Sequence, residues 1–177
     1  KIASEIAGGS DVLDVACATG GLSFILAEKC ETVVGFDISP KNIETAKRKN
    51  RYKNIVFFVK DAAKLDLYEG EKFDYAIVSY VLHEMNPETR IRVIEGTKKV
   101  AKTIILADYD APYDKLFSKG FVHLVEFLAG KEHFRNFLHF NDTNGLRKIA
   151  LNHNLEIEKE IKFGQHLILV ASENGTV

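Results

Sequence analysis

Hydrophobic residues in this chain gather in short runs, and amphipathic segments separate these runs. Five runs have the length of buried strands, and each ends at or near an acidic or small residue. These runs lie at residues 12–15, 32–37, 55–59, 73–79 and 103–109. The segments between them place apolar residues at helical spacing, as at Ile43 and Ala46 or at Ile91 and Ile94. We expect Ile43 and Ala46 to face inward, and Ile91 and Ile94 to lie on one face of their helix. Alternation of strand and helix predicts an α/β fold with a largely parallel sheet.

Capping residues indicate where several helices begin. Ser39 before Pro40 predicts a helix through about residue 50, and Asn86 before Pro87 predicts another after the fourth strand. Residues 2–9 have the pattern of the last turns of a helix ended by two glycines. Two further helices are expected over about residues 113–128 and 142–153.

The last part of the chain has a different pattern. Residues 155–163 and 166–172 alternate apolar and polar side chains on either side of Gly164 and Gln165. Period-two alternation around a short turn predicts an antiparallel hairpin rather than another crossover through a helix.

The first two strands each end at an acidic residue, Asp14 and Asp37. Because parallel strands end at the same edge of a sheet, these carboxylates should lie near each other, where open α/β sheets bind nucleotide-like ligands. A turn of small residues follows Asp14 and ends at Gly20 and Gly21. Small residues let a ligand approach the backbone amides of such a turn closely.

These features carry a resemblance to class I S-adenosylmethionine-dependent methyltransferases. The residues that resemble the first three motifs of that family are Asp14, Gly20, Gly21, Asp37 and the run Lys60, Asp61, Ala62. Residues 73–85 and 103–109 resemble its fourth-strand and fifth-strand segments, so the resemblance covers nearly the whole chain. It implies a Rossmann-like seven-stranded mixed sheet of order 3-2-1-4-5-7-6, with the last strand antiparallel and helices on both faces. The predicted terminal hairpin agrees.

The resemblance implies S-adenosyl-L-methionine as the cofactor and a role for each acid. Asp37 would accept hydrogen bonds from both ribose hydroxyls, and Asp14 would face the cofactor's ammonium through water. Asp61 would accept from the adenine amino group, with the Ala62 amide at a ring nitrogen, although an aspartate after a strand also often caps the next helix. The predicted cofactor-binding residues are Asp14, Ala16, Cys17, Ala18, Gly20, Asp37, Ile38, Asp61, Ala62, Ser79 and Tyr80.

The turn after the first strand departs from the family pattern, which is acid-x-Gly-x-Gly-x-Gly. Here the sequence is Asp14, Ala16, Ala18 and Gly20, so alanine replaces two of three glycines. Alanine is harmless at a negative φ, but a positive φ would cost roughly 1 kcal/mol or more at each position.

Methyl transfer is an in-line displacement, so the protein mainly supplies alignment and desolvation. A base is needed only where the acceptor has a proton to lose. Ser79, Tyr80, His83 and Glu84 follow the fourth strand, and His83 is the candidate catalytic base, since histidine titrates near neutrality. A histidine that packs at the strand end or caps the next helix is the alternative. No Asn-Pro-Pro-aromatic motif follows the strand, so an oxygen, sulfur, carbon or other nitrogen acceptor stays open.

An aromatic and histidine-rich insert lies between the fifth strand and the hairpin and is expected to shape the choice of acceptor. Its residues of interest are Tyr109, Asp110, His123, Glu126, His133, Phe134, Arg135, Phe137 and His139. One helical face at Leu116, Phe117, Phe121, Leu124 and Leu128 indicates core or lid packing. The histidines lack the close spacing of metal ligands, so no metal is expected.

The amino-acid composition limits which partners and which cellular location are expected for this protein. Lys and Arg number 24 against 25 Asp and Glu, so no overall field attracts nucleic acid, although a total conceals local patches. Cys17 and Cys30 lack the spacing of zinc ligands or of a disulfide framework, which favours the cytoplasm. Neither an export leader nor an apolar run of about 18 residues is present, so no membrane contact is expected. We expect one domain over residues 1–177, with its amino-terminal helix truncated.

The sequence therefore predicts a methyltransferase that acts on a small-molecule acceptor. A non-catalytic methyltransferase-like module that binds the nucleoside or a partner is the first alternative. The second is an NAD-dependent oxidoreductase, whose G-x-G-x-x-G turn would need glycine where this chain has Ala16, Ala18 and Gly21. A carboxylate such as Asp14 would also disfavour a dinucleotide's pyrophosphate.

Overall fold

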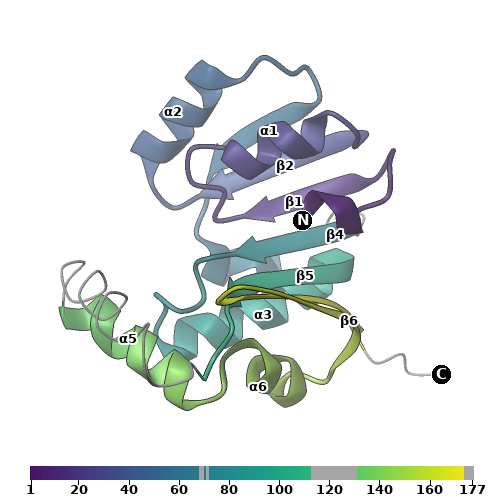
Figure 1. Cartoon of the computed structure of the whole chain (residues 1–177). Coiled ribbons are helices and arrows are strands. Elements are labelled where there is room, and N and C mark those ends of the chain that lie inside the picture. Colours follow the sequence, from purple (N-terminus) through teal and green to yellow (C-terminus); the bar gives the residue numbers. More distant parts are fainter. Residues whose placement is uncertain (68–69, 71, 113–130, 174–177) are drawn as a thin grey trace.

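The computed structural model describes residues 1–67, 70, 72–112 and 131–173 of the 177-residue chain (Figure 1). A single seven-stranded sheet has the order β3-β2-β1-β4-β5-β7-β6. β1 to β5 are parallel, whereas β7 is antiparallel to both β5 and β6. The predicted sheet and its order are confirmed. The strands are β1 (Asp11–Val15), β2 (Thr32–Asp37), β3 (Ile55–Val59), β4 (Phe73–Ser79), β5 (Ala101–Tyr109), β6 (Leu155–Phe163) and β7 (His166–Glu173).

Helices cover both faces of this sheet (Figure 1). α1 (Gly21–Ala27) and α2 (Pro40–Lys49) pack on one face, and α3 (Pro87–Val100), α5 (Lys131–Asp142) and α6 (Gly145–Asn152) pack on the other. Successive strand residues enter opposite cores, as Ile104 and Ile105 do in β5. A sheet buried on both faces needs such continuous apolar strands, which is why they appear as runs in the sequence.

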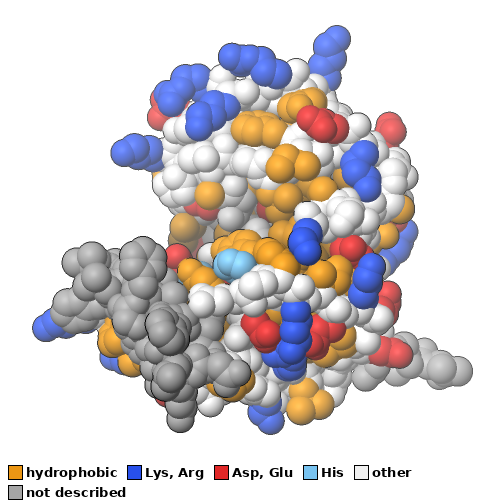
Figure 2. Space-filling model, in the orientation of Figure 1, with side chains coloured by type: hydrophobic (Ala, Val, Ile, Leu, Met, Phe, Trp, Pro, Cys, Tyr) orange, Lys and Arg blue, Asp and Glu red, His pale blue; other side chains and the backbone are white. Residues whose placement is uncertain are grey.

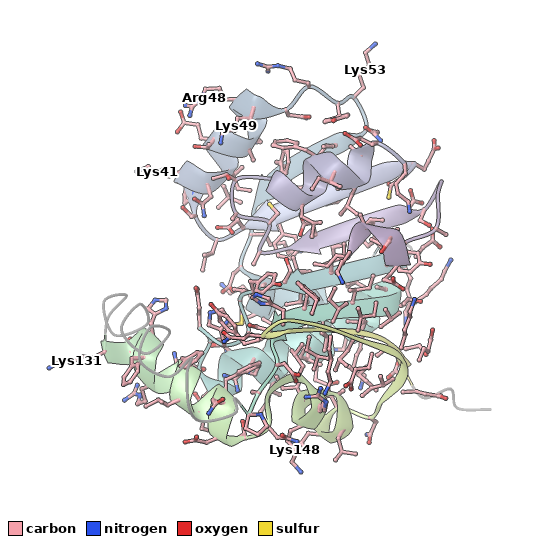
Figure 3. The ribbon with its side chains drawn as sticks, viewed as in Figure 1. Lys41, Arg48, Lys49, Lys53, Lys131 and Lys148 are labelled. Carbon is pink, nitrogen blue, oxygen red and sulfur yellow. The ribbon has the colours of Figure 1, made fainter. Side chains whose placement is uncertain are left out.

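The caps that the sequence indicated are present. The Ser39 hydroxyl accepts a hydrogen bond from the Asn42 amide at 3.3 Å, and the Asn86 side chain accepts one from the Thr89 amide at 2.8 Å. Each cap precedes a proline at the helix start, as predicted. In α2 the buried residues are Ile43 and Ala46. Cationic side chains of α2 and the turn after it point away from the sheet, as Figure 3 shows for Lys41, Arg48, Lys49 and Lys53.

Other helical predictions need correction. Ile91 and Ile94 were expected to share one face of their helix, but Ile94 is buried while Ile91 is 50% exposed, because the buried face of α3 is formed by Arg90, Val93 and Ile94. The amino-terminal segment forms a single 3-10 turn, Ala3–Glu5, where the last turns of a helix were expected. The helix expected at about 142–153 is the shorter α6, and residues 113–128 lie outside the described part.

α5 was not predicted as a helix. Its histidines and asparagines concealed an apolar face, although Phe134, Phe137 and Phe140 follow one another at three-residue spacing. Phe137 and Phe140 are fully buried, and Phe140 joins the core that also contains residues of α6. The carboxyl-terminal hairpin is confirmed, with its turn between Phe163 and His166. In the described part of the chain, no helix combines the length and apolar character that crossing a membrane requires.

Candidate functional site

A cavity of about 710 Å³ opens where β1, β2 and β4 end. The surface is hollowed in this region, between the parts of the molecule that carry α2 and α5 (Figure 2). The cavity is lined by loops that follow strands far apart in sequence. The predicted cofactor-binding residues that line it are Asp14, Ala16, Cys17, Ala18, Asp37, Ile38, Asp61, Ala62, Ser79 and Tyr80. Gly20 and His83 are the predicted site residues outside this lining.

The turn after β1 has a left-handed backbone. Ala16 has φ 57°, Ala18 has φ 47° and Gly20 has φ 83°. Hydrogen bonds fix this shape, since the Cys17 amide donates to the Phe36 carbonyl and the Gly20 amide to the Cys17 carbonyl, both at 2.9 Å. The alanines therefore stand at positions where glycine is unstrained, and the negative φ that would make them harmless is not found.

Glycine at either alanine position is expected to stabilise the fold. Ala16→Gly and Ala18→Gly should each raise the free energy of unfolding by about 1 kcal/mol, because the clash between the methyl group and the backbone disappears. Urea denaturation measures this change. In Ala46→Gly, inside α2, the same substitution should lower stability by about 1 kcal/mol or more. Equal losses at all three positions would contradict the left-handed turn.

Asp37 lies at the end of β2 with 8% of its surface exposed. One carboxylate oxygen accepts from the Ala18 amide at 3.0 Å. The other accepts from the Ser39 amide at 2.9 Å and from the Asn42 side chain at 3.2 Å. The carboxylate therefore faces the cavity and also ties the turn after β1 to the start of α2. Sequence reasoning missed Asn42, although its place in the first turn after an acidic strand end could have indicated it.

Asp14 at the end of β1 is almost fully buried and accepts a hydrogen bond of 2.5 Å from the Ser23 hydroxyl in α1. Burial raises the pKa of Asp14 to about 6, because its charged form loses hydration, while the Ser23 bond opposes the shift. The unfolded carboxyl ionises near pH 3.8, so this group's contribution to stability falls as the pH rises from about 4 to 6. The protein therefore keeps a destabilising charge inside the cavity at neutral pH.

Asp61 in the lining also has a structural role, and Cys17 in the lining stays uncharged. Asp61 accepts a hydrogen bond from the Ala63 amide at 2.9 Å, and so caps the 3-10 helix Ala62–Leu67. Asp61 therefore caps this helix, as the alternative prediction stated, and it also lines the cavity. Burial raises the pKa of the Cys17 thiol, which keeps this lining residue neutral.

Tyr80 leaves β4 in a strained conformation, with φ 54°. Its amide donates to the Ala107 carbonyl at 2.8 Å, and its ring meets the rings of Tyr109 and His166 edge-on, with centroids 6.4 Å and 5.4 Å away. Burial raises the pKa of the Tyr80 phenol, so it is a neutral hydroxyl at the cavity wall. Non-glycine residues keep such a backbone only where their surroundings impose it, which occurs often at functional sites.

His83 is buried behind the cavity lining. Its Nδ1 lies 2.7 Å from Asp108 Oδ1, and its amide donates to Asp108 Oδ2 at 3.2 Å. Its ring packs against Tyr109 and Phe137, with centroids 4.8 Å and 6.2 Å away. Sequence reasoning missed the buried Asp108, although an acid within the fifth strand was a visible signal. The next residue, Glu84, lines the cavity.

The insert after β5 is only partly described. His133, Phe134, Arg135 and His139 belong to α5, whereas His123 and Glu126 lie outside the described residues, as does the face at Leu116–Leu128. Within the described part, no three His, Cys, Asp or Glu side chains are grouped to hold a metal ion. The Asn136 side chain donates to the Glu84 carbonyl at 2.8 Å. α5 therefore supports the loop that follows β4.

A family model described as a methyltransferase domain matches residues 6–142. The chain belongs to this methyltransferase family. The match spans β1 to β5, every loop of the cavity lining and α5. The acids and the turn described above thus lie in the part of the chain that defines the family.

Two curated methyltransferases are similar in sequence. An uncharacterised methyltransferase of Synechocystis sp. is 36% identical over 115 residues, which are 63% of this methyltransferase domain and 53% of that protein. The 2-heptyl-1-hydroxyquinolin-4(1H)-one methyltransferase of Mycobacteroides abscessus is 35% identical over 83 residues, 45% of this chain and 36% of that protein. The chain therefore spans about half, or less, of the length of these relatives.

Solved structures share the fold. The magnesium protoporphyrin IX methyltransferase of Synechocystis PCC 6803, crystallised with S-adenosylmethionine, has a TM-score of 0.64 and 24% identity, over 98% of this chain and 74% of that one. An O-methyltransferase family protein from Burkholderia thailandensis has a TM-score of 0.74 and 16% identity, over 99% of this chain and 55% of that one. At this identity the likeness shows the Rossmann-like methyltransferase fold.

Proposed function

We propose that this methyltransferase domain binds S-adenosylmethionine in the cavity and transfers its methyl group to a small-molecule acceptor by in-line displacement. One observation carries the proposal: Asp14, Asp37 and Asp61 stand at the ends of three adjacent parallel strands around one cavity of about 710 Å³. A cavity of that volume is in the range of small-ligand sites. When bound, the cofactor supplies an electrophilic methyl group on a sulfonium.

The residues of the lining fit this cofactor from one end to the other. Asp14 offers a carboxylate to an ammonium, Asp37 offers one to ribose hydroxyls, and Asp61 with the Ala62 amide offers an acceptor and a donor to adenine. Ile38 is 68% exposed within the same lining. An exposed apolar side chain at a cavity wall is suited to cover the face of a flat base.

Ser79 and Tyr80 lie at the cavity wall after β4, where we place the methionine end of the cofactor. Their role is to align the acceptor and exclude water, since displacement at a methyl carbon depends mainly on orientation. The near balance of 24 Lys and Arg against 25 Asp and Glu supports a small-molecule acceptor rather than nucleic acid. Cations do gather on the solvent side of α2 (Figures 2 and 3), a local feature that the total charge concealed. Cytoplasmic location stays a prediction, supported by the free cysteines Cys17 and Cys30.

Calorimetric titration with S-adenosylmethionine, S-adenosylhomocysteine and NAD tests the proposal. We expect micromolar binding of the first two and none of NAD. Binding of NAD alone would favour the oxidoreductase alternative. Mass spectrometry then follows methyl transfer to a panel of hydroxylated aromatic, N-hydroxy, carboxylate and thiol acceptors, of which the Mycobacteroides relative's hydroxyquinolone is the first member. Cofactor binding without transfer to any member would favour the non-catalytic module.

Binding of S-adenosylmethionine should weaken as the pH falls. Asp14 takes up a proton near pH 6 and then no longer attracts the ammonium, so the affinity should fall about 10-fold between about pH 7.5 and pH 5. Calorimetry at several pH values measures this slope. In Asp14→Asn, affinity should be low and nearly independent of pH, while the apo domain becomes more stable at neutral pH. The same slope in both proteins would exclude Asp14 as its cause.

A further inference from the structure

The loop that follows β4 is held in place by hydrogen bonds from α3, β5 and α5. Arg90 in α3 is buried, and its guanidinium donates to the Leu82 carbonyl at 3.0 Å and to the Met85 carbonyl at 2.9 Å. Asp108 accepts the amide of the residue between them, His83. Together with Asn136 of α5, these contacts hold the backbone of residues 82–85 in place. A loop fixed in this way orients its side chains before any ligand binds.

Three titratable side chains on and under this loop form a line from the cavity into the core. Glu84 Oε1 lies 3.8 Å from His83 Nε2, and His83 Nδ1 lies 2.7 Å from Asp108 Oδ1. The exposed fractions of the side chains are 45%, 6% and 0% in that order. Only Glu84 of the three lines the cavity. One end of this line, Glu84, is therefore accessible from the cavity, and the other end, Asp108, is buried in the protein core.

The hydrogen bonds of Asp108 fix the direction in which a proton can move. Its oxygens accept the amides of His83 and Tyr109, so an ionised carboxylate suits this position. An ionised Asp108 holds the proton of the imidazole on Nδ1. Nε2 then carries the lone pair, and it faces Glu84.

We propose that Glu84 is the catalytic base that removes the acceptor's proton, and that His83, oriented by Asp108, receives this proton from Glu84. The proposal rests on the proposed methyl transfer, and it narrows the acceptor to molecules with an acidic O–H or N–H at the methylated atom. His83 thereby changes from the predicted base to a positioning and relay residue, since its ring lies behind the lining.

The acceptor's lone pair forms the new bond to the methyl carbon, and the methyl–sulfur bond breaks with its electron pair going to sulfur. The O–H or N–H proton of the acceptor passes to the Glu84 carboxylate. It then passes to His83 Nε2 once the half-exposed Glu84 side chain rotates from its 3.8 Å position into hydrogen-bond distance. The imidazolium that results lies between two carboxylates, Asp108 and Glu84, and between turnovers it returns its proton through Glu84 to the solvent in the cavity.

The surroundings of His83 favour such a relay over free exchange with solvent. The rings of Tyr109 and Phe137 pack on the imidazole, and the Phe140 ring lies 6.4 Å away. Among the residues that the structure describes, the charged groups near it are Glu84 on its own loop, Asp108 on β5 and Arg90 on α3, whose guanidinium donates to loop carbonyls. Low local polarity strengthens the coupling between charges at these distances.

NMR titration of the His83 imidazole tests the coupling without cofactor or acceptor, so it is independent of the proposed function. The signal is assigned by its loss in His83→Gln. Replacing Glu84 with glutamine should lower the pKa of His83 by about 0.5 unit or more, because a carboxylate 3.8 Å away no longer stabilises the imidazolium. The control, Glu88→Gln, removes an exposed acid from the first turn of α3 and should leave that pKa unchanged. Equal pKa values in the wild type and Glu84→Gln would overturn the relay.

Kinetics with an acceptor from the panel tests the catalytic role. Glu84→Gln should lower kcat about 100-fold or more, with calorimetric affinity for S-adenosylmethionine within about 2-fold of the wild type. Glu84→Asp should recover part of the rate. The rate of the Glu84→Gln variant should follow only the ionisation of the acceptor itself. A Glu84→Gln variant with wild-type kcat and pH profile would show that Glu84 only lines the cavity.

Discussion

The Asp37→Ala variant is expected to bind S-adenosylmethionine at least about 100-fold more weakly than the wild type. The carboxylate is sheltered in the cavity wall, where a hydrogen bond from a neutral hydroxyl to a charged acceptor contributes roughly 1.5–3 kcal/mol. Loss of the two bonds to the ribose hydroxyls removes about 3 kcal/mol or more, which corresponds to a factor above about 100. Calorimetric titration measures the change.

Two further variants separate this role from the structural one. Asp37 also holds the Ala18 and Ser39 amides, so Asp37→Asn, which keeps one acceptor oxygen, should preserve the turn better while still losing most of the affinity. Asp11→Ala removes an acid from the opposite end of the sheet, where it accepts a bond from Thr32, and should leave binding unchanged. Affinity within about 3-fold of the wild type in Asp37→Ala would remove the ribose contact from the proposal.

Gly20→Ala is expected to lower the free energy of unfolding by about 3 kcal/mol. Its φ of 83° is strained for any residue with a Cβ. An added Cβ would also lie 2.8 Å from the Phe57 ring, 3.0 Å from the Phe24 ring and 3.3 Å from the Ala46 methyl. Backbone strain of about 1–2 kcal/mol and overpacking of about 1–3 kcal/mol act together at this site. Urea denaturation followed by circular dichroism measures the loss.

The neighbouring glycine is the matched control. A Cβ at Gly21 would meet open space, and this residue begins α1, where alanine favours the helix. Gly21→Ala should therefore leave stability unchanged or raise it slightly. If both substitutions cost the same, the close packing of Gly20 against Phe24 and Phe57 is not what requires glycine there.

Local patterns in the sequence determined much of this protein. Ser39 with Pro40 and Asn86 with Pro87 were sufficient to start two helices, because a cap acts within three residues. Apolar runs that end at Asp14 and Asp37 were sufficient to place two acids at one edge of the sheet, because parallel strands end together. The alternation of apolar and polar residues at the end of the chain was sufficient to predict the hairpin of β6 and β7, which forms one edge of the sheet.

Contacts between distant residues were decided only by the tertiary structure. The sequence offered His83 as a base, but the packing of α5 and the position of Asp108, 25 residues further on, bury it and leave Glu84 at the cavity. Ile91 is exposed because the buried Arg90 binds loop carbonyls and sets the rotation of α3. The positive φ at Ala16 and Ala18 depends on bonds to β2. A residue's neighbours along the chain fix its local conformation, but its burial, partners and strain depend on segments that meet only in the folded state.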